Sequence, residues 1–295
     1  MLNVVVYGNG NVAKMAMEAI RHSGDMSLAG VVYPKFAGQT LADGVKIVKD
    51  VDELPACDVA VLALPTRLVP DTAARLLEKG IHTTDSYDIH GDIPAIRSRL
   101  SEIAIAGGAC SILSAGWDPG ADSVVRALLE AMAPQGITYT NFGPGMSMGH
   151  SVAARAVPGV KDALSMTIPL GTGVHRRMVY VQLAEGHTLQ DVTARIKADD
   201  YFSHDETLVF AVDNVGELRD MGHGVHMTRK GVSSGVHNQL FTFEMCCNNP
   251  ALTAQVMVCA ARAAARQKPG CYTMIEIPPV DFLCVDKDEA VRRLV

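Results

Sequence analysis

The sequence lacks several features that would place it in a specialised class of protein. No apolar run among its 295 residues reaches the ~18 residues that a membrane span requires. It has no long block of Lys and Arg, and its formal net charge of −6 argues against nucleic acid as the main partner. The N-terminus looks like a strand and has no signal-peptide pattern. We therefore expect a globular cytoplasmic protein with no nucleic-acid or membrane partner.

Cysteine is present, but without a pattern. The seven cysteines are an odd number, no C-x-x-C pair occurs, and the adjacent Cys246 and Cys247 suit neither a disulfide nor a zinc site. We expect reduced thiols and no metal site. The sequence also has no G-x-S-x-G elbow and no Walker loop, so acyl transfer and phosphoryl transfer have no support.

What the chain does have is a glycine-rich turn near its start. A β-branched run ends at Tyr7, and a helix is predicted from Ala13 to His22. Between them stand Gly8, Asn9, Gly10, Asn11 and Val12, which with Ala13 give G-x-G-x-x-A. A glycine-rich turn of another α/β domain is the alternative. The strand–turn–helix context favours dinucleotide binding, with the pyrophosphate against Gly10 and the helix N-terminus.

Strands and helices alternate over residues 1–118. The apolar runs predict strands at 27–33, 45–48, 59–64, 81–85 and 110–113, with helices at 70–79 and 93–106. This alternation indicates a parallel sheet covered by helices on both faces. The predicted fold class is α/β, with a Rossmann-type doubly wound sheet in a dinucleotide-binding domain over residues 1–118.

The pattern changes after residue 118. A helix at 122–133 leads to strands predicted at 137–142, 163–168, 177–183, 207–212, 225–229 and 240–245, with helices at 189–198 and from Asn249. Strands without regular helical crossovers suggest a mixed or antiparallel sheet. We expect an α+β domain for dimerisation and substrate binding over residues 119–269. A strand at 272–277 and a helix at 287–294 belong to a C-terminal segment, about 270–295, expected to pack back on the first domain.

The end of the second predicted strand bears on the choice of nicotinamide cofactor. An Asp or Glu there would bond the adenosine ribose and repel a 2′-phosphate, but the chain has Tyr33-Pro34-Lys35 and no acid until Asp43. Lys35 could meet a 2′-phosphate and Tyr33 could stack on the adenine, although a solvated lysine without a role is the alternative. NADP is preferred, and NAD stays open. Further candidate cofactor contacts follow the strand at 59–64: Leu64, Pro65 and Thr66.

Three polar clusters follow predicted strands, where an open α/β sheet places its ligands. They are Asp85-Ser86-Tyr87-Asp88-Ile89-His90, Trp117-Asp118-Pro119-Gly120 and a glycine-rich loop over residues 143–150. Two carboxylates at neighbouring strand ends could hold an ammonium group and take its proton as it becomes an imine. Each Asp could instead be a helix N-cap or a turn residue.

The second domain offers an arginine for a substrate carboxylate. Arg177 stands at the start of a predicted strand, and a carboxylate favours a bidentate arginine. A surface basic pair with Arg176 is the alternative. His223 and His226 lie three residues apart in a predicted strand and should face opposite ways, which argues against a metal site.

Several strings together resemble the meso-diaminopimelate dehydrogenase family. They cover residues 85–94, 114–120 and 142–151, and Val157-Pro158-Gly159-Val160 and Asn249-Pro250 extend the resemblance along nearly the whole chain. It implies NADP-dependent oxidative deamination of meso-2,6-diaminopimelate at its D-centre, in lysine biosynthesis. The products would be ammonia and L-2-amino-6-oxopimelate, which cyclises to tetrahydrodipicolinate. The resemblance also implies a homodimer.

The resemblance implies roles for individual residues. Asp88 and Asp118 match the acids beside the reacting D-amino group. Matching the pocket lining are Trp117, Phe142 and Met148, and Gly149 is placed with them. Matching the residues that hold the distal L-amino acid end are Thr167, Arg177, His223 and Asn249.

Two departures from the family pattern leave alternatives open. Better-known members carry arginines where this chain has Tyr33-Pro34-Lys35. The segment between Pro169 and Arg177 is short, as in a subgroup with broader activity toward D-amino acids. A broad-specificity D-amino acid dehydrogenase is therefore one alternative. Dihydrodipicolinate reductase is another, although its basic histidine-and-lysine signature is not found. A non-catalytic NADP-binding sensor is a third, which loss of the carboxylates would favour.

Overall fold

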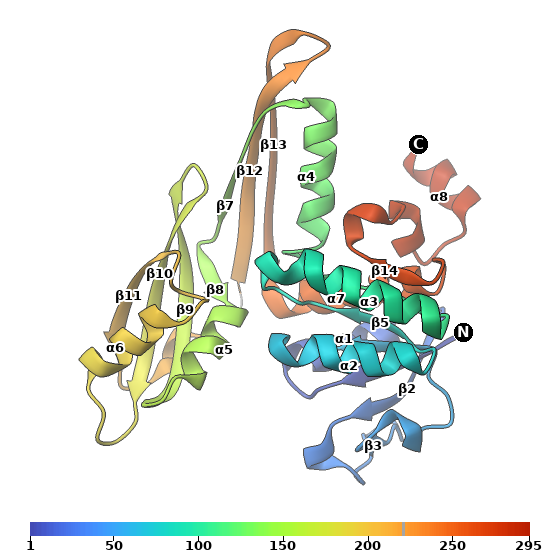
Figure 1. Ribbon diagram of the computed structural model, residues 1–295, viewed down its shortest axis with the longest axis horizontal. Coiled ribbons are helices and arrows are strands. Elements are labelled where there is room, and N and C mark those ends of the chain that lie inside the picture. Colours follow the sequence, from blue (N-terminus) through green and yellow to red (C-terminus); the bar gives the residue numbers. More distant parts are fainter. Residues whose placement is uncertain (220–221) are drawn as a thin grey trace. The chain divides into compact units, whose positions relative to one another are not determined.

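The computed structural model describes residues 1–219 and 222–295, and the chain divides into two compact units (Figure 1). The first unit comprises Met1–Val124 and Pro250–Val295, and the second comprises Val125–Asn249. Among the described residues, no helix has the length and apolar character needed to cross a membrane.

A seven-stranded sheet forms the centre of the first unit. In sheet order its strands are β14 (Gly270–Tyr272), β6 (Cys110–Ile112), β5 (His82–Asp85), β4 (Val59–Leu62), β1 (Leu2–Tyr7), β2 (Met26–Val32) and β3 (Ile47–Val48). Every neighbouring pair is parallel. The predicted doubly wound α/β fold is confirmed.

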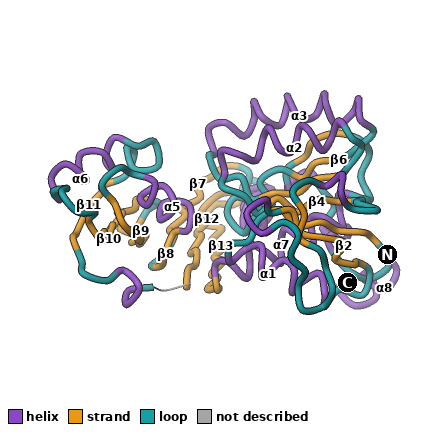
Figure 2. Tube along the Cα trace, turned by 90° about the horizontal axis from the view of Figure 1, so that it is seen from below, coloured by secondary structure: helices purple, strands orange, loops and turns teal. Residues whose placement is uncertain are grey.

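Helices cover both faces of this sheet (Figure 2). On one face lie α2 (Val69–Glu78) and α3 (Ile93–Gly107), whose Leu76, Leu77 and Leu100 are fully buried in one core. On the other lie α1 (Asn11–Arg21) and α7 (Asn249–Ala264), which share a second core. Because both faces are covered, β4 is apolar along its whole length and Val4, Val5 and Val6 of β1 are 0% exposed.

Helix α7 corrects the predicted domain boundary. The predicted second domain, 119–269, included this helix, but residues 250–264 of α7 belong to the first unit. Met257, Val258 and Ala261 of α7 are 0% exposed and pack in the core that contains Val4 and Val6 of β1. The helix is apolar on nearly all sides, so its sequence pattern does not show which unit it covers.

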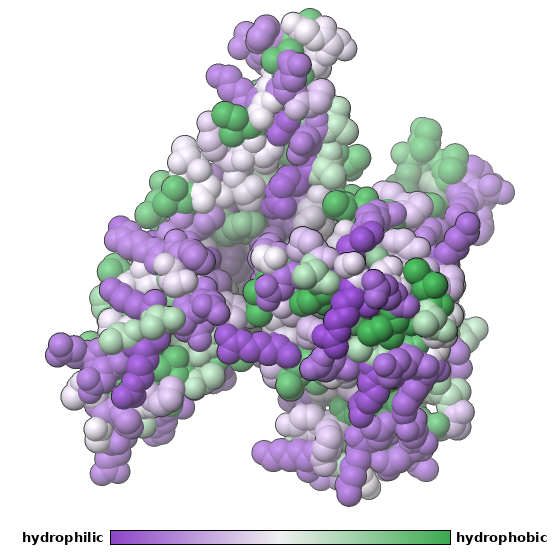
Figure 3. Space-filling view, viewed as in Figure 1, coloured by the Kyte–Doolittle hydropathy of each residue, from purple (hydrophilic) through white to green (hydrophobic). Residues whose placement is uncertain are grey.

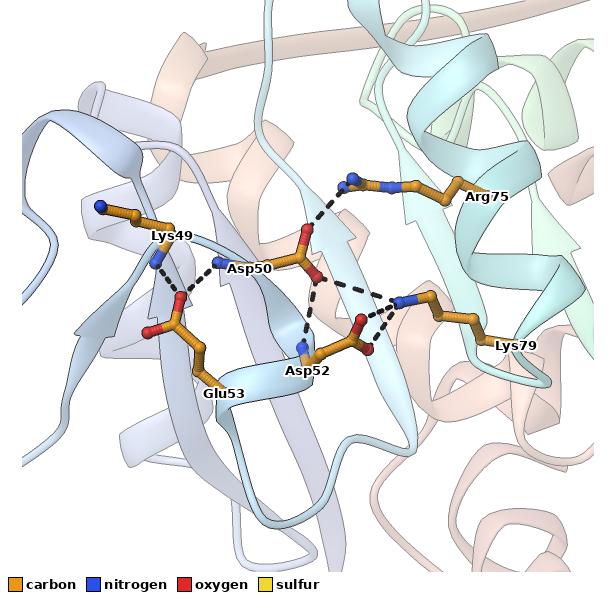
Figure 4. Close-up of polar contacts among 6 residues, drawn as sticks. All are labelled: Lys49, Asp50, Asp52, Glu53, Arg75 and Lys79. Atoms are coloured by element: carbon orange, nitrogen blue, oxygen red, sulfur yellow. Dashed lines mark hydrogen bonds and ion pairs between the residues drawn. The ribbon is translucent and has the colours of Figure 1, made fainter.

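Charged side chains fasten the connection between β3 and β4 to α2 (Figure 4). Asp50 and Glu53 form a capping box around the short turn Val51–Glu53. Arg75 Nη1 lies 3.1 Å from Asp50 Oδ2, and Lys79 pairs with Asp52. The side chains are partly exposed, so each pair stabilises the fold by about 0–1 kcal/mol.

The second unit contains two sheets. The mixed sheet has the order β11 (Glu206–Ala211), β10 (Val174–Leu183), β9 (Val160–Gly171) and β8 (Gly145–Ser147), with only β10 and β11 parallel. Helices α5 (Met148–Ala156) and α6 (Leu189–Ala198) share its core. The antiparallel sheet has the order β13 (Val236–Asn248), β12 (Gly222–Ser233) and β7 (Gln135–Phe142). The predicted α+β character with a mixed sheet is confirmed.

The remaining helices join or end the units. Helix α4 (Ala121–Met132) begins in the first unit and continues into the second, and α8 (Lys287–Leu294) ends the chain.

Two predictions of local structure are wrong. The loop predicted at 143–150 contains strand β8 and the first turn of α5. The strand predicted at 272–277 ends at Tyr272, and a 3₁₀ turn, Met274–Glu276, follows. Thr273 and Glu276 form a capping box there, which satisfies the backbone N–H groups of these two residues.

A buried arginine joins α7 to the loop before β2. Arg262 is 4% exposed, and its guanidinium donates to both carboxylate oxygens of Asp25, with Nη2 2.8 Å from Oδ1. These hydrogen bonds hold the pKa of Asp25 well below its usual range.

We expect Asp25→Asn to lower the free energy of unfolding by about 3 kcal/mol near neutral pH, because it leaves a buried guanidinium without its counter-charge. A carboxyl whose pKa is lower in the folded state stabilises the fold above its unfolded pKa, and that stabilisation is lost as the pH falls through the folded pKa. Urea titrations at about pH 7 and about pH 3 should therefore show the difference shrinking in acid.

The matched control for this experiment is Asp52→Asn, which breaks the exposed pair with Lys79. It should cost less than about 1 kcal/mol. An equal cost for the two variants would contradict the assignment.

Candidate active site

The turn from β1 into α1 has no room for a side chain at its first glycine. Gly8 has φ +112°, and a Cβ there would stand 2.3 Å from the carbonyl oxygen of Ala63. At Gly10 a Cβ would meet no protein atom within 4 Å. Helix α1 has no acid in its first turn and no side-chain cap on its N-terminal N–H groups. These features fit an anionic group that approaches Gly10 and receives hydrogen bonds from the helix N-terminus.

The end of β2 presents a phenol and an ammonium group. Tyr33 packs edge-on against Phe36 with ring centroids 5.3 Å apart, and Lys35 is exposed in the short turn Pro34–Phe36. The first acid after β2, Asp43, is paired with Arg21 at 2.6 Å. The side chains present therefore fit a ribose that carries a phosphate better than a ribose that needs a carboxylate.

Three neighbouring strands bring polar side chains to one edge of the first sheet. Thr66 follows β4, Asp88 follows β5 and Asp118 follows β6, and the carboxyl ends of these parallel strands lie at the same edge. Thr66 Oγ1 donates a hydrogen bond to Asp88 Oδ1 at 2.5 Å. Both acids are half-buried.

Neither acid occupies a helix N-cap. The N-cap of α3 is Asp92, and α4 begins at Ala121, three residues after Asp118. Asp88 and Asp118 are therefore not the N-cap residues of α3 and α4. Trp117, beside Asp118, is 5% exposed.

Arg177 is held from two sides within the second unit. It pairs in register with Thr167 of β9, and its Nη1 donates to Thr167 Oγ1. Its Nε donates to Asp205 Oδ2 at 2.6 Å. The Arg177 side chain is 14% exposed, and its Nη2 has no partner among the described residues. A guanidinium oriented in this way can receive a carboxylate through the remaining amino group.

The alternative prediction, a basic residue at the surface, describes Arg176 and not Arg177. The side chain of Arg176 is 35% exposed and pairs with Glu206.

Strand β8 contacts the other residues of the second unit that the sequence predicts for the site, namely Thr167, His223 and Asn249. Gly145 pairs with Thr167, and a Cβ at Gly145 would lie 2.7 Å from the Cα of His223. Asn249 Nδ2 donates to the carbonyl oxygen of Met146 at 3.2 Å. His223 is 7% exposed and Asn249 is 5% exposed. We call Thr167, Arg177, His223 and Asn249 the distal cluster.

Phe142 contacts His175, which lies two residues before Arg177 on β10. The backbone N–H of Phe142 donates to His175 Nε2 at 2.7 Å, and the two ring centroids are 5.4 Å apart. Burial, with Arg177 nearby, lowers the pKa of His175, which keeps Nε2 available as an acceptor. Met148 and Gly149 begin α5, and Met148 packs against a small core that contains Leu164.

Sequence reasoning missed Asp205 and the role of His175. His175 lies two residues before Arg177 on β10, so strand alternation could have placed both on one face. Asp205 reaches Arg177 because β11 pairs in parallel with β10, which no local pattern shows.

The two histidines of β12 face opposite ways, as predicted. His223 is buried and His226 is exposed. Among residues 1–219 and 222–295, no group of three or more His, Cys, Asp or Glu side chains could hold a metal ion.

Comparison with known proteins identifies the family. The family model for the diaminopimelic acid dehydrogenase C-terminal domain matches residues 116–176, and the model for the CoA binding domain matches residues 1–84. The meso-diaminopimelate D-dehydrogenase of Bacteroides fragilis is 54% identical over 100% of this chain and 99% of its own length. The chain belongs to the meso-diaminopimelate D-dehydrogenase family. Members of this family are oxidoreductases.

Solved structures agree with this family. A DAP dehydrogenase of C. glutamicum in complex with DAP superposes with a TM-score of 0.90 at 28% identity and covers 100% of this chain and 99% of its own. An engineered D-amino acid dehydrogenase bound to NADP+ gives a TM-score of 0.88 at 27% identity, with coverage of 100% and 99%. These likenesses support a nicotinamide cofactor.

Two glycine substitutions distinguish the turn's contribution to stability from its contribution to dinucleotide binding. Gly8→Ala should lower both the melting temperature and the affinity for the dinucleotide, because its Cβ would meet the backbone of Ala63. Gly10→Ala should keep the melting temperature and still weaken dinucleotide binding, because only a ligand would meet its Cβ. Thermal unfolding and fluorescence titration with the reduced cofactor measure the two effects. Unchanged affinity in Gly10→Ala would place the pyrophosphate elsewhere.

Proposed function

We propose that this protein catalyses the NADP-dependent, reversible oxidative deamination of meso-2,6-diaminopimelate at its D-centre. The products are ammonia and L-2-amino-6-oxopimelate, which cyclises to tetrahydrodipicolinate in lysine biosynthesis. The observation that carries this proposal is the distal cluster, which offers a cationic and amide-bearing site for an amino acid group. Asp88 and Asp118, at the edge of the other unit's sheet, suit an ammonium group that loses a proton. Diaminopimelate carries an amino acid group at each end.

The acids act at the reacting amino group. When bound, the nicotinamide ring accepts a hydride from the D-centre. Loss of that hydride requires a neutral amine, so Asp118, or a water it orients, takes the ammonium proton. Asp88, which accepts a hydrogen bond from Thr66, is the second candidate. Water then hydrolyses the imine of the substrate.

The distal cluster holds the L-amino acid end. Arg177 presents Nη2 to the distal carboxylate while Asp205 and Thr167 fix the other two nitrogens. His223 and Asn249 complete the hydrogen bonds to that end. Binding energy at the distal end orients the D-centre and supports stereoselectivity. Lining the pocket in this proposal are Trp117, Phe142, Met148 and Gly149.

Ten residues would hold NADP. They are Gly8, Asn9, Gly10, Asn11 and Val12 of the turn, Tyr33 and Lys35 after β2, and Leu64, Pro65 and Thr66 after β4. The absence of an acid between Val32 and Asp43 supports NADP over NAD. The structural relative bound to NADP+ supports the same choice.

A broad D-amino acid dehydrogenase remains the second candidate. β9 and β10 are joined by Thr172 and Gly173 alone, both with positive φ, so the connection before Arg177 is as short as a hairpin allows. The B. fragilis relative at 54% identity favours diaminopimelate as the substrate.

We further propose a homodimer. Ile137 of β7 and Leu240 of β13 flank Lys230 in one row across the three-stranded sheet, and both are about 60% exposed. Figure 3 shows scattered apolar side chains among hydrophilic ones over these strands. A second copy of the chain would cover this face, and a monomeric mass in ultracentrifugation would contradict it. All seven cysteines are free, which supports a cytoplasmic location.

The function is tested by incubating the protein with NADP and meso-diaminopimelate and following the absorbance of the reduced cofactor. Asp118→Asn should lower kcat by about 10²–10⁴-fold, and Asp88→Asn by a smaller factor, because the ammonium loses its proton acceptor. If both variants keep a near-normal kcat, the acid assignment is wrong. If the unsubstituted protein reduces no cofactor, the sensor hypothesis is favoured.

The distal cluster is tested with two adjacent arginines. Arg177→Ala should raise KM for diaminopimelate by about 10²-fold, because a charged hydrogen bond to substrate is lost. It should change KM for D-alanine little, since D-alanine has no distal end. Arg176→Ala is the matched control and should leave both values unchanged. Equal effects of Arg177→Ala on the two substrates would remove it from distal recognition.

A further inference from the structure

Asp85 is a buried carboxyl group at the point where β5 ends. Its side chain is 0% exposed. Its Oδ1 accepts the backbone N–H of Tyr87 at 2.9 Å and that of Ser114 at 3.0 Å. Its carbonyl oxygen accepts the N–H of Ala115 at 2.6 Å. One residue therefore ties the loop after β5 to the loop after β6.

These two loops carry the proposed acids. Asp88 follows Tyr87 directly, and Asp118 lies four residues beyond Ser114. Ser114 has φ +58°, a conformation that non-glycine residues rarely adopt and that persists only where the surroundings hold it. The loops also touch each other, since a Cβ at Gly116 would lie 3.5 Å from the Cβ of Ser86.

We propose that Asp85 is a positioning residue for the deamination: its carboxylate holds the loops of Asp88 and Asp118 in the relative arrangement that proton transfer requires. This inference rests on the proposed function. Asp85 is 0% exposed, so this proposal gives it no contact with the substrate. Hydrogen bonds accepted by a charged group are about twice as strong as those between neutral groups, so the charge on Asp85 stiffens both loops.

The buried negative charge of Asp85 destabilises the folded protein, and the chain nevertheless has Asp at this position. A buried carboxylate without a counter-charge is expensive, and a neutral Asn could accept the same two N–H bonds. Oδ2 of Asp85 has no hydrogen-bond partner among the described residues, so a proton can add there without displacing a bond. The charge therefore has a use beyond holding the fold together.

The charge of Asp85 changes near neutrality. Burial raises the pKa of Asp85 to about 6, against the opposing effect of the Ser114 and Tyr87 N–H groups. The titratable groups coupled to it are Tyr87 on its own loop and Cys271 of β14, while Arg97 of α3 is bound to Glu276. Above about pH 6 Asp85 accepts the two N–H bonds as a charged carboxylate, and below about pH 6 it accepts them as a neutral carboxyl group.

The test is Asp85→Asn, compared with the unsubstituted enzyme under NADP and meso-diaminopimelate. At about pH 7.5 its kcat should fall roughly tenfold, while KM for each substrate changes less than about twofold. The kcat of the unsubstituted enzyme should fall between about pH 7 and pH 5. The kcat of the variant should fall much less over the same range, because the variant has no carboxyl group to protonate at this position. A merely structural residue would not move the pH profile.

Thr83→Val is the matched control. Thr83 Oγ1 donates to Ser111 Oγ at 2.9 Å between the same two strands, and both residues are 0% exposed. This variant should lower the melting temperature and leave kcat and its pH profile unchanged. The inference is overturned if Asp85→Asn keeps the original kcat and profile, or if it only loses stability as Thr83→Val does.

Hydrogen exchange on the unsubstituted protein tests the same inference without a variant. Because burial raises the pKa of Asp85, an opening that exposes its carboxyl becomes less favourable as the pH falls through about 6. Corrected for intrinsic rates, the amides of Tyr87 and Ser114 should therefore gain protection over this range, while that of Ile112 in β6 should not. Protection that does not change with pH overturns the role of Asp85. An unsubstituted protein that reduces no cofactor with diaminopimelate would overturn the proposed function instead, whatever the exchange shows.

Discussion

The parallel pairing of β4, β5 and β6 is the constraint on which the polar edge of the first unit depends. Parallel strands end at one edge, so Thr66, Asp88 and Asp118 come from three separate loops and still lie at that edge. The strands themselves are held by cores on both faces. Asp85 lies at this edge, buried with the core and bonded to both loops.

The second unit holds a cationic group and an amide group in place through side-chain hydrogen bonds. Arg177 would be mobile on an open strand, but Asp205 and Thr167 bind two of its nitrogens. Glycine makes the surrounding packing possible. A Cβ at Gly143 would lie 2.3 Å from the carbonyl oxygen of Thr167, and one at Gly145 would collide with β12. Close strand packing around the distal cluster thus explains Gly143 and Gly145.

Local patterns predicted the parts of this molecule that depend on local physics. Apolar runs and the Gly8 turn predicted the parallel sheet, and the positions of Asp88 and Asp118 after strands predicted that both lie at one edge of it. Properties that depend on pairing could not be read in this way. The register of Thr167 against Arg177 and the parallel approach of Asp205 join residues far apart in the chain. The predicted domain boundary was wrong at α7, because a helix that is apolar on nearly all sides could pack against either unit. The predicted end of β14 was wrong because a 3₁₀ turn with a capping box begins after Tyr272.

The central claim is that diaminopimelate reacts at its D-centre while its L-end is held by the distal cluster. The most direct measurement uses meso-diaminopimelate with deuterium at the D-centre and follows the label by mass spectrometry after turnover with NADP. The account predicts that the deuterium moves to the reduced cofactor, with a slower rate than for unlabelled substrate when hydride transfer limits turnover. Deuterium retained in the oxopimelate product would contradict the account, because the other centre would then have reacted.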